Sequence, residues 1–335
     1  MINIRQGVSL LSRNTFGIPA TASVFVESDN HAELADFVRS LPEPSAAFVL
    51  GGGSNILLIS NRLDVVIHPV MKGIELIDET DEHVLVRAGA GEIWDDFVNW
   101  CVEREFAGVE NLSHIPGTVG ACPIQNIGAY GAEAKETVET VEAIEKETGR
   151  AVSFDNQQCL FGYRDSFFKQ NKGKYIITAV RFRLSKRFEP NVNYNDLKTE
   201  LSRNSSITLK NVRQAVIDIR RRKLPDPSEL GNVGSFFKNP TIPFEKSSEI
   251  SKLYPEAPLY PVSQECCKIS AAWLIQQCGW KGIREGNVGA HERQPLVIVN
   301  YGGANGKEIL DFAQKIIHSI WVKFGVHLEP EVNIV

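Results

Sequence analysis

The residues with the clearest chemical potential lie in one stretch, residues 115–131, with the sequence IPGTVGACPIQNIGAYG. The stretch is too apolar for an ordinary surface loop and too rich in glycine and proline for a regular helix or strand. Glycine lets the main chain approach a ligand closely, and proline stiffens the same segment. We therefore interpret it as a loop whose main-chain N–H groups bind a flat, polar-edged or phosphorylated cofactor. A buried connection between elements is the alternative.

A second glycine motif, residues 51–55 (GGGSN), follows one apolar run and precedes another. A dinucleotide-binding fingerprint of the Rossmann type needs a helix after its glycines, and the following run ILLI favours a strand. Successive glycine N–H groups also form anion-binding nests without a helix, and Ser54 and Asn55 add side-chain donors. Two such loops that face each other would hold a dinucleotide between two small domains.

Two further glycine motifs do not fit the binding patterns that they suggest. Residues 89–91 lie between a predicted strand and a predicted helix, but Trp94 occupies the third glycine position and is too large for close helix–strand packing. Residues 301–307 resemble a phosphate-binding loop only superficially, because Glu308 stands where Ser or Thr is required. We interpret the second of these motifs as a turn.

The composition is that of a soluble globular protein, with 335 residues, 43% hydrophobic and 23% charged. This length predicts two or three domains. A net charge of −5 argues against nucleic acid or an anionic membrane as a partner. No apolar run reaches the roughly 18 residues of a membrane span, and the first residues lack a signal peptide. We expect a cytoplasmic monomer that acts on small molecules.

The cysteines predict neither a metal site nor a disulfide framework. The six residues have no metal-ligand spacing, and two of them are adjacent. We expect reduced thiols that mostly fill the core, and no bound metal.

The predicted elements indicate an α+β protein rather than a doubly wound sheet, because strands outnumber helices along most of the chain. The predicted strands are residues 23–27, 46–50, 56–59, 65–67, 74–77, 84–88, 138–146, 151–154, 175–184, 296–300 and the extended segment 326–335. The predicted helices follow Asn30 and cover residues 93–103, 212–222, 271–278 and 306–324. Residues 224–240 are rich in proline and glycine and are predicted to be a loop.

These motifs together resemble a known family. Residues 51–55, 115–117 and 125–131 resemble the FAD-binding fold of the vanillyl-alcohol-oxidase type. Residues 163–165 (YRD), 234–240 (GSFFKNP) and 329–331 (EPE) narrow the resemblance to the UDP-N-acetylenolpyruvoylglucosamine reductases (UDP-N-acetylmuramate dehydrogenases) of bacterial cell-wall synthesis. Residues 161–168 and 194–196 resemble the type I branch of that family. The resemblance extends from residue 14 to residue 335 with the motifs in the expected order.

The resemblance implies a three-domain α+β flavoprotein. Residues 1–70 and residues 71–218 with 326–335 would be two small domains that hold FAD between them, and residues 219–325 would bind the substrate. The resemblance also implies that NADPH reduces non-covalently bound FAD, which then reduces an enolpyruvyl ether to a lactyl ether. Negative charge develops on the carboxylate side during such a reduction, and the site has to stabilise it.

The resemblance assigns three catalytic residues. Ser235 would donate the proton, and it needs electrostatic assistance because a hydroxyl is a weak acid. Arg164 and Glu331 would stabilise the enol intermediate, since a guanidinium fork suits a carboxylate or enolate. The alternatives are that Ser235 is a turn serine, that Arg164 pairs with Asp165, and that Glu331 faces water.

The resemblance also assigns binding residues. The cofactor-binding residues would be Gly51, Gly52, Gly53, Ser54, Asn55, Ile115, Pro116, Gly117, Thr118, Gly120, Ala121, Gln125, Asn126, Ile127, Gly128 and Ala129. The substrate-binding residues would be Tyr163, Tyr194, Lys223, Lys238, Asn239 and Gln294. The basic run at residues 220–223 is otherwise typical of a helix C-terminus, where cations complement the dipole.

Two rival functions remain open. A flavin oxidase of the same fold would oxidise an alcohol with oxygen, and many such enzymes attach flavin covalently through histidine or cysteine; His114 lies close to the glycine loop. A nucleotide-sugar-binding module without catalysis is the other alternative. A proton donor is unnecessary for binding alone, so the set Arg164, Ser235 and Glu331 argues against the module.

Overall fold

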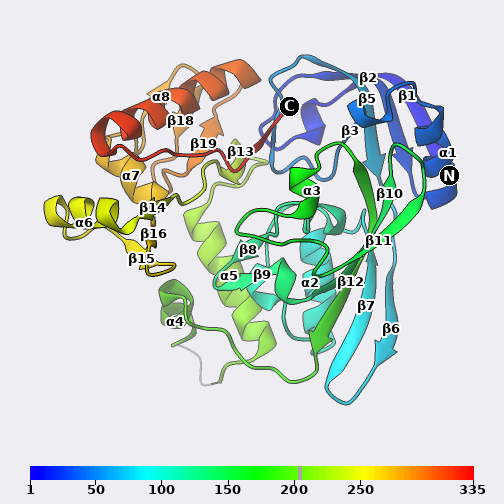
Figure 1. Ribbon diagram of the computed structural model, residues 1–335, viewed down its shortest axis with the longest axis horizontal. Helices are drawn as coiled ribbons and strands as arrows, with labels where there is room; N and C mark the ends of the chain where they lie inside the picture. The colour runs from blue at the N-terminus through cyan, green and yellow to red at the C-terminus, as the bar shows by residue number, and fades with distance from the viewer. Residues whose placement is uncertain (203–205) are drawn as a thin grey trace. The chain divides into compact units, whose positions relative to one another are not determined.

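The computed structural model describes residues 1–202 and 206–335, which form two compact units (Figure 1). Both units are discontinuous in sequence. Unit 1 comprises Met1–Ser9, Thr21–Gly53 and Arg62–Arg222, and unit 2 comprises Leu10–Ala20, Ser54–Asn61 and Lys223–Val335. The domain boundaries that we expect at residues 70 and 218 remain predictions.

Unit 1 contains two sheets and most of the longer strands. Its elements are β1 (Ile2–Ser9), β2 (Thr21–Ser28), α1 (His31–Ser40), β3 (Phe48–Val49), β5 (Arg62–Pro69), β6 (Ile74–Glu79), β7 (His83–Gly89), α2 (Trp94–Glu103), β8 (Gly128–Ala129), β9 (Ala132–Glu133), β10 (Val138–Glu145), β11 (Ala151–Asp155), α3 (Phe167–Gln170), β12 (Tyr175–Ser185), α4 (Asn195–Leu201) and α5 (Leu209–Lys223), whose last residue belongs to unit 2.

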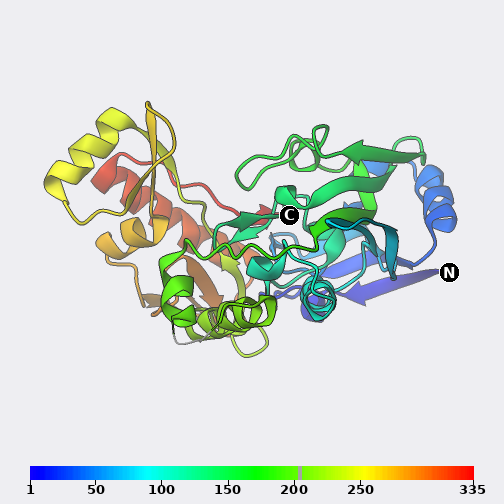
Figure 2. The same ribbon diagram turned by 90° about the horizontal axis from the view of Figure 1, so that it is seen from below.

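The first sheet of unit 1 has the strand order β1-β2-β5-β3. Strands β2, β5 and β3 are parallel, and β1 joins β2 as an antiparallel edge strand, drawn in deep blue beside the N-terminus (Figure 2). Helix α1 begins after Asn30, whose side chain accepts a hydrogen bond from the Glu33 N–H and so caps the helix as predicted. Its buried residues Leu34 and Val38 pack into the core with Ile67 of β5.

The second sheet of unit 1 is antiparallel throughout, with the order β11-β10-β12-β7-β6. Helix α2 contributes the buried side chains of Trp94 and Phe97 to the same core as β12. The Phe97 and Phe182 ring centroids are 4.6 Å apart. The helix predicted for residues 93–103 is confirmed by α2, and the strands predicted for residues 138–146 and 151–154 are confirmed by the antiparallel pair β10–β11. Their apolar residues recur with the periods of a helix and of a strand.

Unit 2 combines short strands with three helices in its described residues. Its elements are β4 (Ile56–Leu57), β13 (Gly231–Ser235), β14 (Thr241–Pro243), α6 (Phe244–Leu253), β15 (Leu259–Pro261), β16 (Cys266–Ile269), α7 (Ala271–Gln277), β17 (Arg284–Glu285), β18 (Val288–Ala290), β19 (Val297–Asn300), α8 (Gly306–Phe324) and β20 (Asn333–Ile334).

The core of unit 2 lies between its main sheet and α8. The sheet has the order β13-β19-β18-β17, and α8 packs on β18 and β19 (Figure 1). The predicted apolar stripe of α8 is confirmed, since its five residues are all buried: Ile309, Phe312, Ile316, Ile320 and Phe324. Asn305 caps the start of α8 in a capping box with Glu308.

Several sequence predictions need correction. Residues 224–240, predicted to be a loop, contain strand β13. The sequence does not indicate this strand because three of its residues, Gly231, Gly234 and Ser235, are not apolar strand-forming residues. The predicted strands 46–50 and 56–59 shorten to β3 and β4. Within residues 326–335, β20 is the one regular element that the structure describes. Strand β1 and the group α6, β14, β15 and β16 were not predicted.

All six cysteines carry free thiols, and Cys101, Cys122, Cys159 and Cys267 are buried, as expected for core residues. In the described part of the chain, no helix is both long and apolar enough to cross a membrane.

Candidate active site

The two glycine loops meet in unit 1, as the sequence predicted. A Cβ atom added at Gly52 would lie 2.8 Å from the Gly117 Cα atom, which is closer than any real contact. A Cβ atom at Gly51 would lie 3.2 Å from Thr118 Oγ1 and 3.5 Å from Ala121 Cβ. The main chains therefore approach each other directly, and glycine is needed at residue 52 for steric reasons. This close approach fits a loop pair that encloses a flat or phosphorylated group.

The start of α2 holds one side of the loop 115–131. The Gly117 carbonyl accepts a hydrogen bond from the Trp94 N–H at 3.0 Å, and the Val119 N–H donates to the Glu92 carbonyl at 2.9 Å. The Gly120 N–H donates to the Ala90 carbonyl, also at 2.9 Å. These N–H groups are used inside the protein, so only part of the loop's main chain is left for a cofactor. This is a correction to the expectation that the loop offers its main-chain donors generally.

The segment 161–168 is tied to the same loop by three hydrogen bonds. Arg164 Nη2 donates to the Gly128 carbonyl at 2.5 Å, and Ser166 Oγ donates to the Ile124 carbonyl at 2.6 Å. The buried Asn126 side chain donates to the Gly162 carbonyl at 2.9 Å. Arg164, a predicted catalytic residue, is therefore held against a predicted cofactor-binding residue.

Asn126 acts as an internal support. Its Nδ2 also donates to Glu133 Oε2, and its Oδ1 accepts from the Lys135 N–H, both at 2.9 Å. These bonds occupy the side chain of this fully buried residue. Any contact with a cofactor would have to use its main chain.

Two predicted substrate-binding tyrosines also lie in unit 1. Tyr163 lies beneath the Arg164 guanidinium, 5.4 Å from the ring centroid, and is more than a third exposed. Tyr194, at the start of α4, makes an edge-to-face contact with Tyr130, with centroids 5.3 Å apart. Burial raises the pKa of Tyr130, so its hydroxyl stays protonated at neutral pH.

In unit 2, strand β13 presents Ser235 at an irregularity. The pairing of β13 with β19 shifts between Asn232 and Ser235, and Gly234 has a φ of +73°. The buried Asn232 holds this turn, because its Oδ1 accepts from the Gly234 N–H at 2.9 Å. Its Nδ2 donates to the carbonyls of residues 225 and 230. Within the described chain, Ser235 Oγ makes no hydrogen bond, so the hydroxyl is available to a ligand.

Main-chain pairing brings Glu331 next to Ser235. The Glu331 N–H donates to the Phe236 carbonyl at 2.7 Å, and the Lys238 N–H donates to the Glu329 carbonyl at 3.0 Å. A bridge between Phe237 and Pro330 continues the same pairing. The two predicted catalytic residues of unit 2 are therefore on adjacent strands of main chain.

Asn55 of the first glycine motif joins this cluster. Its Nδ2 donates to the Glu331 carbonyl at 3.5 Å, and its own carbonyl accepts from the Asn333 N–H at 3.1 Å. The parallel pair β4–β20 continues from there, with Asn333 opposite Ile56. Residues that the sequence separates widely are brought together by this contact.

The remaining predicted substrate residues of unit 2 are Asn239, Lys238, Gln294 and Lys223. Asn239 Oδ1 accepts from the Ala271 N–H at 2.9 Å, which leaves Nδ2 as the group that it can offer to a ligand. Lys238 Nζ lies 3.8 Å from Glu329 Oε2. Gln294 lies in the turn before β19, where its N–H donates to His291 Nδ1 at 3.3 Å. Lys223 is the last residue of α5.

The predicted site residues are divided between the two units. Unit 1 holds Gly51–Gly53, the whole of 115–129, Tyr163, Arg164 and Tyr194. Unit 2 holds Ser54, Asn55, Lys223, Ser235, Lys238, Asn239, Gln294 and Glu331. The contacts described above connect site residues within each unit. That the residues of both units form one site is part of the proposal below.

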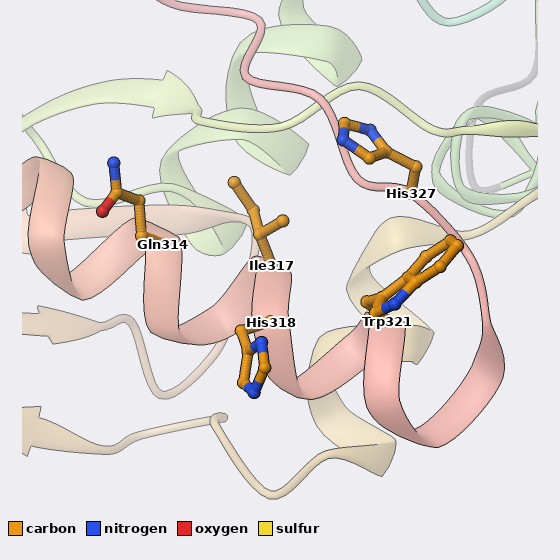
Figure 3. Close-up of a pocket in the computed structure, with 5 residues that line it drawn as sticks. All are labelled: Gln314, Ile317, His318, Trp321 and His327. Carbon is orange, nitrogen blue, oxygen red and sulfur yellow. The ribbon is translucent and has the colours of Figure 1, made fainter.

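A hollow of about 350 Å³ lies elsewhere, along the exposed side of α8 in unit 2 (Figure 3). Gln314, Ile317, His318 and Trp321 of α8 line it together with His327. None of these side chains belongs to the predicted set. In residues 1–202 and 206–335, no group of three or more His, Cys, Asp or Glu side chains is arranged to hold a metal.

Sequence reasoning missed the supporting residues. Asn232 was not singled out, although an asparagine two residues before Gly234 is a known means of stabilising a tight turn. Asp95 and Arg213 were also missed. Arg213 Nη1 donates to Asp95 Oδ1 at 2.6 Å, and the same oxygen accepts from the His114 N–H at 2.5 Å, just before the cofactor loop. This contact spans residues far apart in sequence, so no local pattern indicates it.

Comparison with known proteins gives two family matches along the chain. Residues 22–155 match the family described as "FAD binding domain", and residues 226–335 match "UDP-N-acetylenolpyruvoylglucosamine reductase, C-terminal domain". The chain is 46% identical to the UDP-N-acetylenolpyruvoylglucosamine reductase of Flavobacterium johnsoniae, with 100% of both chains covered. It is 41% identical to that of Pseudomonas aeruginosa, with 99% of both chains covered.

A solved structure supports the fold alone. The crystal structure of UDP-N-acetylenolpyruvylglucosamine reductase from Thermus caldophilus has a TM-score of 0.71 to this chain, at 22% identity, with 100% of this chain and 99% of the other covered. The predicted α+β flavoprotein fold is confirmed.

The glycine loops and the matched FAD-binding domain define a flavin-dependent oxidoreductase. The sequence identities of 46% and 41% over the full chain then identify the family within that class. The chain belongs to the UDP-N-acetylenolpyruvoylglucosamine reductase family, as its motifs predicted.

Proposed function

We propose that the protein reduces UDP-N-acetylglucosamine enolpyruvate to UDP-N-acetylmuramate, a step in peptidoglycan precursor synthesis, with NADPH as the electron source and FAD as the relay. Membership of the family supports the reaction, and the relatives' names state the enolpyruvyl sugar nucleotide as substrate. The structural observation that supports it most is the main-chain pairing that places Glu331 beside Ser235.

FAD, when bound, supplies the hydride that NADPH has delivered to it. Its binding would use Gly51–Asn55 and the main-chain groups of residues 115–129 that are not used in hydrogen bonds inside the protein. The steric fit of Gly52 on Gly117 supports a non-covalent site built by close main-chain approach. The whole cofactor-binding set given above is included in this proposal.

Ser235 is the proton donor in this proposal. Its Oγ makes no hydrogen bond within the described residues, and the main-chain turn that carries it is held by Asn232. A proton donor needs this combination of fixed geometry and a free polar atom. The proton is delivered to the carbon next to the one that receives hydride.

Arg164 and Glu331 stabilise the negative charge that develops on the substrate. Arg164 is positioned by the Gly128 carbonyl and by its contact with Tyr163, and its fork suits a carboxylate or an enolate. Glu331 is positioned through its main chain, and in this proposal its carboxyl group orients Arg164 or acts as a second acid. Tyr163, Tyr194, Lys223, Lys238, Asn239 and Gln294 bind the sugar nucleotide, and NADPH uses the same basic groups in alternation.

The visible spectrum of the purified protein tests the reaction. NADPH added without oxygen should bleach a flavin spectrum, and the enolpyruvyl sugar nucleotide should restore it. Restoration by oxygen but not by the nucleotide would indicate the flavin oxidase instead. A protein without flavin that binds the nucleotide would indicate the binding module.

The variant Ser235→Ala tests the proton donor. Reduction of the flavin by NADPH should be nearly unchanged, and reoxidation by the nucleotide should slow by at least about 10²-fold, as for a lost general acid. Stopped-flow absorbance separates the two half-reactions. Ser228→Ala, an exposed serine that bonds to Asp226, is the matched control. Equal impairment of both half-reactions would remove Ser235 from this role.

A further inference from the structure

The first turn of α2 contacts the segment that leads into the cofactor loop at three points. Trp94 Nε1 donates to the Leu112 carbonyl at 2.8 Å, and the Trp94 N–H donates to the Gly117 carbonyl at 3.0 Å. Between these two contacts, Asp95 Oδ1 accepts from the His114 N–H at 2.5 Å. The path of the main chain into the loop is therefore set by two consecutive residues of α2.

His114, at the middle contact, has an unusual main-chain conformation. Its φ is 59°, in the left-handed region where the Cβ atom of a non-glycine residue is crowded. Such a residue costs free energy and persists where its surroundings enforce it. The next residue, Ile115, precedes Pro116 and is restricted to extended conformations. The direction in which the chain enters the loop therefore depends mainly on His114.

Both main-chain polar groups of His114 are bound by charged side chains. The N–H donates to Asp95, and the carbonyl accepts from Arg220 Nε at 3.0 Å. Hydrogen bonds that involve a charged group are about twice as strong as neutral ones. The N–H and the carbonyl belong to the two peptide planes on either side of the His114 Cα atom. Fixing both planes fixes the left-handed conformation.

Arg213 of α5 holds the Asp95 carboxylate in position. Its Nη1 and Nη2 donate to the two Asp95 oxygens at 2.6 and 3.0 Å, and its Nε donates to Asn99 Oδ1 at 3.2 Å. Burial alone would raise the pKa of Asp95, but the hydrogen bonds from Arg213 and the His114 N–H outweigh it and lower the pKa. A two-pronged contact of this kind fixes the plane of the carboxylate as well as its charge.

We propose that Asp95, oriented by Arg213, is a positioning residue for the cofactor. It enforces the left-handed conformation of His114 and so places Gly117 against Gly52. A Cβ atom added at Gly52 would lie 2.8 Å from the Gly117 Cα atom, so a small shift of Gly117 changes this contact. The inference rests on the proposed function only in that the two glycine loops bind FAD.

Glycine at residue 114 isolates the conformational effect, because glycine adopts a positive φ without penalty whereas alanine retains the Cβ atom. The starting variant, Asp95→Ala/Arg213→Met, removes the ion pair without leaving either charge unpaired. Flavin fluorescence during dilution of the holoprotein measures FAD affinity. The ion-pair variant should bind FAD about tenfold more weakly than wild type, the effect of a lost charged hydrogen bond. Adding His114→Gly should restore most of the affinity, and adding His114→Ala should restore none.

A general role of the ion pair in holding α2 on α5 is the competing explanation. Glu103→Gln is the matched control, because Glu103 pairs with Lys210 of α5 at 2.8 Å, at the other end of α2. This variant should bind FAD like wild type. Asp95→Asn, a milder change that keeps an acceptor for the His114 N–H, should have an affinity between those of wild type and the ion-pair variant.

Three results would overturn the role of Asp95. They are equal FAD affinity with glycine and alanine at residue 114, wild-type affinity in the ion-pair variant, and an equal loss in Glu103→Gln. Gly52→Ala tests the FAD site itself. Unchanged FAD affinity in Gly52→Ala would refute the loop pair as the FAD site. A loss there, with no difference between His114→Gly and His114→Ala, would refute the role of Asp95 alone.

Discussion

The two regions that supply the candidate site are built in different ways. In unit 1, the loop 115–131 uses its main chain for internal hydrogen bonds and meets Gly51 and Gly52 without room for side chains. In unit 2, main-chain pairing holds Ser235 and Glu331 in place, and the Ser235 hydroxyl has no hydrogen-bond partner among residues 1–202 and 206–335. In the proposed site, the first region would provide shape, and the second would provide reactive side chains. Substitutions in the two regions should therefore fail in different ways.

The largest effect is expected at Gly52. Gly52→Ala would place a Cβ atom 2.8 Å from the main chain of Gly117, and neither segment can yield cheaply. Overpacking of this kind costs roughly 1–3 kcal/mol, so FAD affinity should fall by up to about 10²-fold. Flavin content after gel filtration measures it. Gly162→Ala, where the added atom would lie 3.5 Å from Asp165 Cβ, is the control. Full flavin content in Gly52→Ala would contradict a cradle built by close packing.

Asn232→Ala should impair the region of unit 2 and leave the region of unit 1 unaffected. Its loss frees the Gly234 N–H and the turn that presents Ser235, and a misplaced catalytic group can cost about 10²-fold in rate. We expect kcat to fall by about 10-fold to 10²-fold while FAD content stays at the wild-type level. Steady-state kinetics and flavin absorbance measure the two quantities on one sample. Loss of FAD together with activity would show that the two regions do not have separate roles in cofactor binding and catalysis.

Lys223→Ala should weaken both NADPH and the sugar nucleotide by about tenfold, because a charged hydrogen bond contributes about 1.5–3 kcal/mol. Competition between the two ligands should also be visible in wild type. Lys210→Ala, on the same helix but paired with Glu103, controls for loss of a surface charge. Separate effects on the two ligands would show that they do not share the basic groups.

The smallest effect concerns Lys146, a fully buried amine in unit 1. Its Nζ donates to the carbonyls of Ala47 and Ser45 at 2.6 and 3.1 Å, just before β3. Burial lowers the pKa of Lys146 to about 8. Below that pH the folded state bears the cost of a buried charge. Above it, up to the ordinary value of 10.5, the unfolded chain binds the extra proton and folding stability rises.

Urea unfolding at several pH values between 7 and 10 tests this prediction. Relative to Lys146→Met, wild type should gain about 1 kcal/mol of unfolding free energy over that interval, with the shift discounted for residual solvent screening. Lys174→Met, an exposed lysine nearby in sequence, is the control. Parallel pH dependences of wild type and Lys146→Met would show that the amine stays charged.

The sequence predicted the parts of the fold and of the candidate site that depend on local pattern. The glycine loops, α2 and α8 follow from composition and period, and the family followed from the motifs. Strand β13 was missed because Gly231 and Gly234 carry no apolar alternation, and its position depends on pairing with β19. The supports Asn232, Asp95 and Arg213 were missed because their partners are set by tertiary contacts. The motifs indicated both Glu331 and Ser235, but the position of Glu331 beside Ser235 also depends on a tertiary contact that the sequence does not show.

The discontinuity of unit 2 has a consequence for the kinetics of folding. Asn55 and Glu331, which bond to each other, are 276 residues apart, and Phe16 and Asn300 are 284 apart. Closing such long loops costs entropy before any contact stabilises the result, so we expect unit 2 to form slowly. Most of unit 1 comes from one continuous stretch, Arg62–Arg222, and should form earlier. During refolding, the two glycine loops of unit 1 should then meet before the turn of unit 2 that carries Ser235 is formed.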